Sequence, residues 1–169
     1  MVLCCGAAAW FAPSIIPKVA TNPAEVTAIG KQILDLDIPK EFQPETAISM
    51  DNFAMIMKMA TYKYQGNAGD LIIGNVQIKM GDPRQQPDFQ KGGQTRDLQM
   101  GDTVVRELIV RGEKVPFRFS EAVETTSKKD FHVVEGELRS GGVTTFLKLV
   151  LEAGVYNEEE AIEMIQSIR

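Results

Sequence analysis

Long stretches of the chain alternate between hydrophobic and polar residues, which is the period of a β-strand. Every second residue from Val143 to Leu151 is apolar or threonine and falls on one side of an extended chain. The same alternation runs through Asp102–Glu121, on both sides of Gly112-Glu113, and through Phe131–Leu151, around the Ser-Gly-Gly at 140–142. The pattern predicts two β-hairpins, each with one apolar face.

The expected turn at Gly112-Glu113 also predicts the register of the first of these hairpins. The expected cross-strand pairs are Val110 with Val115, Leu108 with Phe117, and Glu107 with Arg118. The second hairpin is expected to share one apolar face made by Val134, Leu138, Val143, Leu147 and Leu149.

A third hairpin is predicted over Ala47–Ala60, around an Asp-Asn turn signal at 51–52. Its second strand carries Met55, Met57 and Met59 on one face, which we expect to be buried. Thioether groups can bind Cu(I), but strand methionines without histidine or cysteine nearby are typical of core packing. A further strand is predicted over Leu71–Met80.

Two amphipathic helices are predicted, one before these strands and one after them. The first runs from Asn22 to Leu34, with Asn22 as its cap and Pro23 at its first position. The second begins at Asn157, and its apolar stripe is spaced at i, i+3, i+4 and i+7 up to Ile168. Both helices need a surface on which to bury their stripes.

The segment Gly81–Gly101 is the least regular part of the chain. It is rich in Gln, Pro, Gly and Asp, and it is interpreted as a mobile excursion. Short helical turns are expected within it at Pro87–Lys91 or Gln94–Met100.

The N-terminal run Val2–Ile16 carries no charge, but its 15 residues are fewer than the ~20 of a spanning helix. Three interpretations are open: a membrane anchor, a signal peptide without a basic n-region, or a buried helix of the domain. Trp10 and Phe11 suit a membrane interface and favour the anchor. We therefore expect an anchor or its remnant at residues 1–20 and a single domain at residues 21–169.

Composition narrows the function classes. The 169 residues are 44% hydrophobic, which suits one domain with a core, and the net charge of -5 argues against a nucleic-acid partner. The densest basic group, made by Arg106, Arg111, Lys114 and Arg118, is interspersed with glutamates and is interpreted as a solvated ribbon.

Residues able to carry chemistry are few. His132 is the only histidine and is expected to be structural, and Asp35 with Asp37 lacks the glycine and the distal glutamate of a calcium loop. Cys4 and Cys5 are adjacent and belong to no Cys/His cluster. We therefore predict no catalytic, cofactor or metal site and no cofactor.

Apolar residues also occur on the faces that the helices would leave uncovered. They are Val105, Ile109 and Pro116 in one hairpin, and Phe131, Val133, Phe146 and Val150 in the other. Either the segment Gly81–Gly101 folds over them, or they form an exposed interface for a partner. We favour the first, with the segment able to open for a partner, because long irregular segments in compact domains are often functional.

The order of these elements resembles that of a known group. The apolar start, the TNPAEV helix start, the DIPKEFQP entry, the RELIVRGEKVPFRF hairpin and the final VTTFLKLVLEAGVYNEEEAIEMIQSI carry the resemblance. It is to uncharacterised membrane-anchored bacterial proteins, planctomycete ones among them, and more remotely to the PsbP-like group that includes Ran-binding Mog proteins. The resemblance implies an antiparallel sheet flanked by helices and a binding or assembly role.

The expectation is therefore an α+β protein, an α-β-α sandwich with an antiparallel sheet of about six strands. Its expected function is that of a membrane-tethered, extracytoplasmic, non-enzymatic binding or assembly factor. Its expected partners are the membrane, through the N-terminal segment, and an unknown protein. The alternative is a small hydrolase with a carboxylate/histidine site, for which His132 is the best candidate.

Overall fold

The structure is a computed structural model and describes residues 16–80 and 96–169. Its helices are α1 (Pro23–Ile33), α3 (Glu158–Gln166) and the short 3-10 turn η2 (Gln65–Asn67). Its strands are β1 (Lys18–Ala20), β2 (Phe42–Asp51), β3 (Met55–Tyr64), β4 (Gly69–Ile78), β5 (Leu98–Val110), β6 (Glu113–Glu124), β7 (Asp130–Ser140) and β8 (Val143–Glu152).

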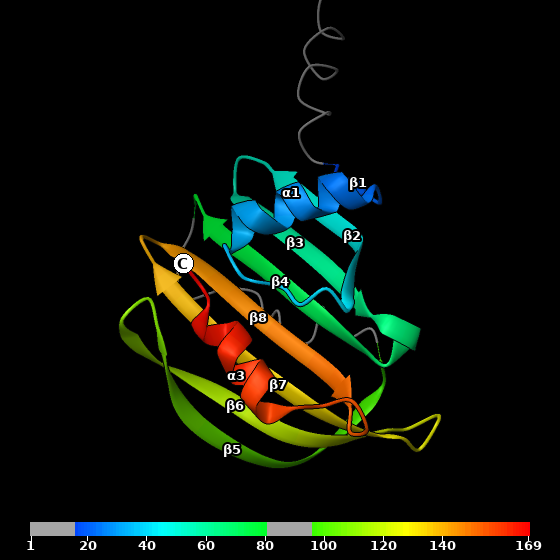
Figure 1. Ribbon diagram of the computed structural model, residues 1–169. Coiled ribbons are helices and arrows are strands. Elements are labelled where there is room, and N and C mark those ends of the chain that lie inside the picture. Colours follow the sequence, from blue (N-terminus) through cyan, green and yellow to red (C-terminus); the bar gives the residue numbers. More distant parts are fainter. Residues whose placement is uncertain (1–15, 81–95) are drawn as a thin grey trace, which may run out of the picture.

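All of these strands join one antiparallel sheet in the order β1-β2-β3-β4-β8-β7-β6-β5 (Figure 1). Short hairpins make neighbours of β2 and β3, of β5 and β6, and of β7 and β8. Strand β8 pairs with β4, so the last hairpin lies in the centre of the sheet. The C-terminal strand thus joins the two halves of the molecule.

Both α-helices cover the same face of the sheet (Figure 1). The main core contains Val26 of α1, Ile165 of α3 and one face of the strands, including Leu71, Leu147 and Phe117. We call this side the helix face. The cap predictions are confirmed, because the Asn22 side chain accepts a hydrogen bond from the Ala24 backbone and Asn157 accepts bonds from the Glu159 and Glu160 backbones.

The predicted α-β-α sandwich of about six strands is wrong. The structure has an eight-stranded sheet with little helix, and in the described residues both α-helices lie on one side. Strand β1 is three residues long, too short to show a period, and forms because β2 offers it an edge. Hydrophobic periodicity shows that a helix buries one stripe but does not show which face of the sheet receives it.

The predicted register of the β5–β6 hairpin is wrong by two residues. Val110 lies opposite Glu113, Leu108 opposite Val115, and Arg106 opposite Phe117. The cause is the turn, because Arg111 adopts a left-handed φ of 54° beside Gly112 at 80° and the two form the tight loop. A shift of two preserves the faces, so the predicted apolar side is confirmed.

The predicted transmembrane helix and membrane partner are not supported. Among the residues that the structure describes, no helix is long and apolar enough to cross a membrane. Lys18–Ala20, at the end of the predicted anchor segment, form an edge strand on β2 instead. Residues 1–15 lie outside the described residues, and the division of the chain at residue 20 stays a prediction.

The irregular segment is shorter than expected. Leu98–Gly101 belong to β5, where Leu98 pairs with Glu124 and Met100 with Ala122, so the helical turn predicted at Gln94–Met100 is wrong in its described part. Residues 81–95, including the turn predicted at Pro87–Lys91, lie outside the described residues.

Candidate functional site

Strands β6 and β7 are paired along only part of their length. Their ladder runs from Val123 opposite Asp130 to Phe117 opposite Gly136 and stops there. Beyond that point β6 stays paired with β5, and β7 stays paired with β8. The two hairpins therefore diverge toward their tips, and we call the space between them the fork.

A proline explains where the ladder ends. The two-residue turn of the β5–β6 hairpin makes Val110 and Glu113 a hydrogen-bonded pair, so Lys114 and Pro116 turn their backbone groups away from β5. Continuing the register would place Pro116 opposite Glu137. Because proline has no backbone N–H, it cannot donate the hydrogen bond that this pair needs.

Contacts with the C-terminal helix hold the β5–β6 hairpin on its side of the fork. Arg106 forms an ion pair with Glu158 at the start of α3. Nη2 of Arg111, in the hairpin turn, donates a hydrogen bond to the Arg169 carbonyl at 2.6 Å. The β7–β8 hairpin instead continues the sheet through β4. The fork thus lies between one hairpin fixed to α3 and one fixed to the centre of the sheet.

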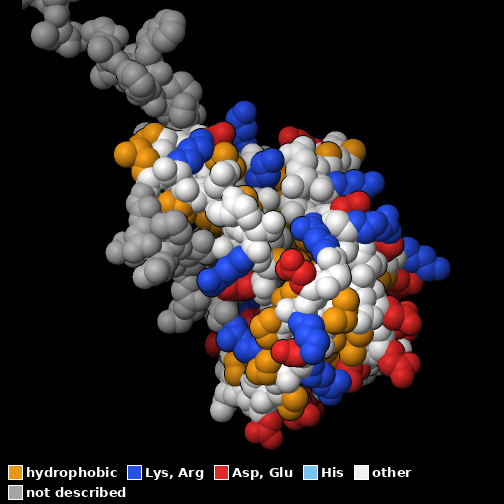
Figure 2. Space-filling view, turned by 90° about the vertical axis from the view of Figure 1, so that its left-hand side faces the viewer, with side chains coloured by type: hydrophobic (Ala, Val, Ile, Leu, Met, Phe, Trp, Pro, Cys, Tyr) orange, Lys and Arg blue, Asp and Glu red, His pale blue; other side chains and the backbone are white. Residues whose placement is uncertain are grey.

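The fork opens into a cleft of about 730 Å³, within the range of ligand-binding pockets. Its apolar lining consists of Ile72, Val105, Val110, Val115, Pro116, Leu138, Phe146 and Leu147. Figure 2 views the side of the molecule that carries the hairpin tips, where hydrophobic side chains gather among Lys, Arg, Asp and Glu side chains. We call this space the fork cleft.

The rim of the fork cleft is charged and slightly basic. Its basic residues are Arg111, Lys114, Arg118, Arg139 and Lys148, and its acidic residues are Glu113, Glu135 and Glu137. Five positive and three negative side chains give a net charge of +2, whereas the whole chain carries -5. The fork cleft is therefore a local basic region on an acidic protein.

Ion pairs organise this rim. Arg118 and Glu135 form a cross-strand pair at 2.9 Å, and Lys148 lies 3.9 Å from the same carboxylate. Arg139 pairs with Glu137 at 3.2 Å. The sequence pattern predicts that four basic residues form a solvated ribbon. Three of them line the cleft instead, namely Arg111, Lys114 and Arg118. The fourth, Arg106, points toward α3.

The outer wall of the fork cleft is exposed and apolar. Val105 is 61% exposed and lines the cleft, whereas its neighbour Val104 is 55% exposed and points to the helix face. Ile109, on the same face as Val105, is 49% exposed. The sequence pattern places several apolar residues on faces without a helix. Of these, Phe131, Val133 and Val150 are buried, so the exposed apolar surface lies at the fork.

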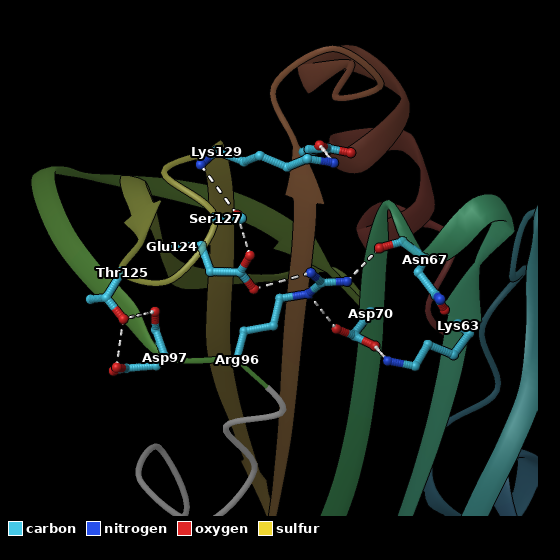
Figure 3. Close-up of polar contacts among 10 residues, drawn as sticks. Lys63, Asn67, Asp70, Arg96, Asp97, Glu124, Thr125, Ser127 and Lys129 are labelled. Atoms are coloured by element: carbon cyan, nitrogen blue, oxygen red, sulfur yellow. Dashed lines mark hydrogen bonds and ion pairs between the residues drawn. The ribbon is translucent and has the colours of Figure 1, made fainter.

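Ion pairs around a buried aspartate lie at the opposite, closed end of the β6–β7 ladder (Figure 3). Asp70 is fully buried and accepts from Lys63 at 2.7 Å and from Nε of Arg96 at 3.1 Å. Arg96 also pairs with Glu124 at 3.3 Å and lies 4.9 Å from the centroid of the Phe131 ring. We call Lys63, Asp70, Arg96 and Glu124 the ion cluster.

Side-chain hydrogen bonding and charge lower the pKa of Glu124 in the ion cluster. The main cause is the hydrogen bond that Ser127 donates to its carboxylate, and the charge of Arg96 adds to the effect. The ion cluster joins β3, β4 and β6 to the residues that enter β5. It is a structural ion-pair network that holds these segments together.

His132 lies on the helix face near the closed end of the ladder. Its ring stacks on Tyr156 at 4.3 Å between centroids, with an interplanar angle of 17°. Burial, together with the charge of Glu158, raises the pKa of Tyr156 to about 12. His132 lies opposite Glu121 in the β6–β7 ladder, and both line a second pocket of about 480 Å³ together with Asp130. In the described part of the chain no hydrogen bond joins His132 to a carboxylate, and the alternative hydrolase hypothesis stays a prediction.

The other candidate residues occupy structural positions. Met55, Met57 and Met59 follow one another on the face opposite the helices, but they are half-buried rather than buried as expected. Asp37 pairs with Arg169. Within residues 16–80 and 96–169, no group of three His, Cys, Asp or Glu side chains could hold a metal ion.

Sequence reasoning missed the fork because the fork depends on register. A signal was present, since a proline within a strand that has neighbours on both sides conflicts with ladder pairing. Gly136 was a second signal. The Phe117 ring lies against it, and a Cβ built at Gly136 would come within 2.4 Å of Cδ1 of Phe117.

Comparisons with known proteins add little to this geometry. No family model and no curated protein matches the chain. Among solved structures the chain is similar to LpqN, described as involved in cell envelope biogenesis of Mycobacterium tuberculosis, with 13% identity and a TM-score of 0.32. That alignment covers 92% of this chain and 80% of LpqN.

Similarity at this level carries no inference about this chain. The resemblance to membrane-anchored bacterial proteins and to the PsbP-like group therefore stays a prediction.

Proposed function

We propose that this protein is a non-enzymatic binding or assembly factor whose ligand site is the fork cleft. The observation that carries the proposal is the end of the β6–β7 ladder at Phe117 and Gly136, which leaves a cleft of about 730 Å³ between two fixed hairpins. A pocket held open by the fold needs little reorganisation when a ligand enters, which favours binding.

The chemistry of the lining supports binding rather than catalysis. Two of the three rim carboxylates, Glu135 and Glu137, form ion pairs with Arg118, Lys148 and Arg139. These pairs position charge around an apolar floor, which is the arrangement of a recognition surface. An extracytoplasmic location goes with this proposal, because the uncharged run at residues 2–16 is typical of exported chains.

The anionic dye 8-anilinonaphthalene-1-sulfonate tests the proposal, because its fluorescence rises in apolar sites and its charge suits a basic rim. Saturable binding to the folded protein is expected. Val105→Asp should weaken binding about tenfold or more, corresponding to about 1.4 kcal/mol, because it places a carboxylate on the cleft wall.

The matched control is Val104→Asp, the same change one residue away on the other face and at similar exposure. It should leave dye binding unchanged. Equal loss in both variants, or no loss in either, would place the dye elsewhere and contradict the proposed site.

A further inference from the structure

We infer that the ligand of the fork cleft is an extended peptide segment that alternates apolar and acidic residues and adds to strand β7 through its main chain. The inference rests on the proposed function and names the class of partner. Four observations carry it: the backbone groups of β7, the missing donor of β6, and the lining of each face.

Strand β7 presents unpaired main-chain groups to the fork. The two-residue turn at Gly141-Gly142 makes Ser140 and Val143 a hydrogen-bonded pair, so Glu137 and Arg139 turn their N–H and C=O groups away from β8. In the described residues no strand pairs with them on that side. These two residues offer two donors and two acceptors along one edge.

Strand β6, on the facing side of the fork, offers fewer backbone N–H donors than β7. Lys114 and Pro116 are its counterparts on β6, and Pro116 supplies only a carbonyl. A strand that enters the fork therefore finds the more complete hydrogen-bonding edge on β7. Alternate residues of an extended ligand have the spacing needed to meet both Glu137 and Arg139.

A purely apolar ligand fits this site less well. Covering the N–H and C=O groups of Glu137 and Arg139 without giving them partners would remove their hydration at a cost. A peptide main chain supplies matching groups in the strand geometry. The backbone of the fork thus favours a peptide over a lipid tail.

The two faces of the fork differ in chemistry, and this difference sets the ligand's side chains. Toward the helix face the lining is apolar, with Val110, Val115, Leu138 and Leu147. Toward the other face the lining is mixed, with the charged Lys114, Arg118, Arg139, Lys148, Glu135 and Glu137 beside the apolar Ile72, Val105, Pro116 and Phe146. Side chains of an added strand alternate between these faces, so apolar residues should alternate with acidic ones.

The test uses an acetylated, amidated heptapeptide that alternates valine and glutamate, with a fluorescent label for anisotropy. Binding is expected, together with displacement of the dye from the fork cleft. Two isomeric peptides, N-methylated on one or the other alternate set of amides, test the main-chain contacts. The isomer that lacks the donors for β7 should bind at least tenfold more weakly than the other isomer.

A peptide that alternates valine and lysine should bind more weakly than the glutamate peptide, most clearly at low salt. Pro116→Thr should also reduce binding, because the new N–H lets Thr at this position continue the ladder to Glu137 and close the fork. Its thermal unfolding and its dye binding show whether the fold persists and whether the cleft has closed.

The outcomes separate the inference from the proposed function. If the dye binds at Val105 but the glutamate peptide does not, the peptide inference is wrong and the proposed site stands. Equal affinity of the two N-methylated isomers would overturn main-chain addition. If neither dye nor peptide binds, the proposed function fails together with the inference.

Discussion

Arginine–carboxylate ion pairs lie at both ends of the β6–β7 boundary, but the strands are paired at one end and separated at the other. At one end, Arg96 bridges Asp70 and Glu124, and the ladder is complete. At the other end, Arg118 and Arg139 pair with glutamates around an open cleft. Similar ion pairs thus close the sheet in one place and line an opening in the other.

The difference lies in burial and in the backbone. Asp70 is fully buried, so its partners are held in a low-dielectric site, whereas the Arg139 side chain is 75% exposed. At the open end the missing N–H of Pro116 removes the main-chain bond that would draw the strands together. Charge stabilises the closed end, and backbone chemistry keeps the other end open.

The largest expected effect is at the closed end. Asp70→Ala leaves Lys63 and Arg96 without their shared buried carboxylate and should lower the free energy of unfolding by about 3 to 5 kcal/mol, as measured by urea denaturation. Asp51→Ala removes a similar pair with Lys79 at an exposed site and should cost about 1 kcal/mol or less. Equal losses in the two variants would refute the contrast.

A smaller effect is expected at the apex of the fork. Gly136→Ala places a Cβ 2.4 Å from Cδ1 of Phe117 and should cost about 1 to 3 kcal/mol through overpacking. Gly154→Ala is the control, because a Cβ there meets nothing within 4 Å. In the double variant Gly136→Ala/Phe117→Leu, the loss of unfolding free energy should be smaller than the sum of the two single losses. A double loss equal to that sum would show that the ring contact is unimportant.

Much of the fold could be predicted because its signals are local. The helix caps Asn22 and Asn157 and the alternation in β8 each depend on neighbours in sequence. Strand β1 could not be predicted, since it depends on an edge provided by β2. The placement of both helices on one face was likewise missed, because this is decided by connections between distant elements.

The candidate site was predicted only in its parts. The sequence identified Val105, Ile109 and Pro116 as uncovered, and all three are exposed in the structure, with Val105 and Pro116 lining the fork cleft. It did not identify the cleft, because the direction of the Pro116 backbone follows from a register that the predicted turn misplaced by two residues. A left-handed φ is uncommon for arginine, so the residue type at position 111 does not indicate that the turn begins there.

Acid should weaken the ion cluster at the closed end of the ladder by protonating Glu124. The pKa of Glu124 lies below its ordinary value in the folded protein, so its contribution to stability is present above pH 4.5 and is lost as the pH falls through the lowered pKa. Ser127→Ala removes the main cause and should raise the pKa of Glu124 toward its ordinary value. Carboxyl carbon shifts in an NMR titration measure this, and an unchanged midpoint would contradict the assigned cause.

The smallest expected effect compares one left-handed residue from each end. Lys128 has a φ of 61° in the turn before β7, and Arg111 has a φ of 54° in the turn at the tip of the fork. Lys128→Gly relieves backbone strain and should stabilise the protein by about 0.5 to 1 kcal/mol in urea denaturation.

Arg111→Gly relieves similar strain but removes the hydrogen bond to the Arg169 carbonyl that holds the β5–β6 hairpin against the C-terminus. Its gain should therefore be smaller or absent, and its dye affinity should change because the fork is less fixed. Equal stabilisation by both changes, with unaltered dye binding, would mean that the Arg111 contact does not hold the fork open.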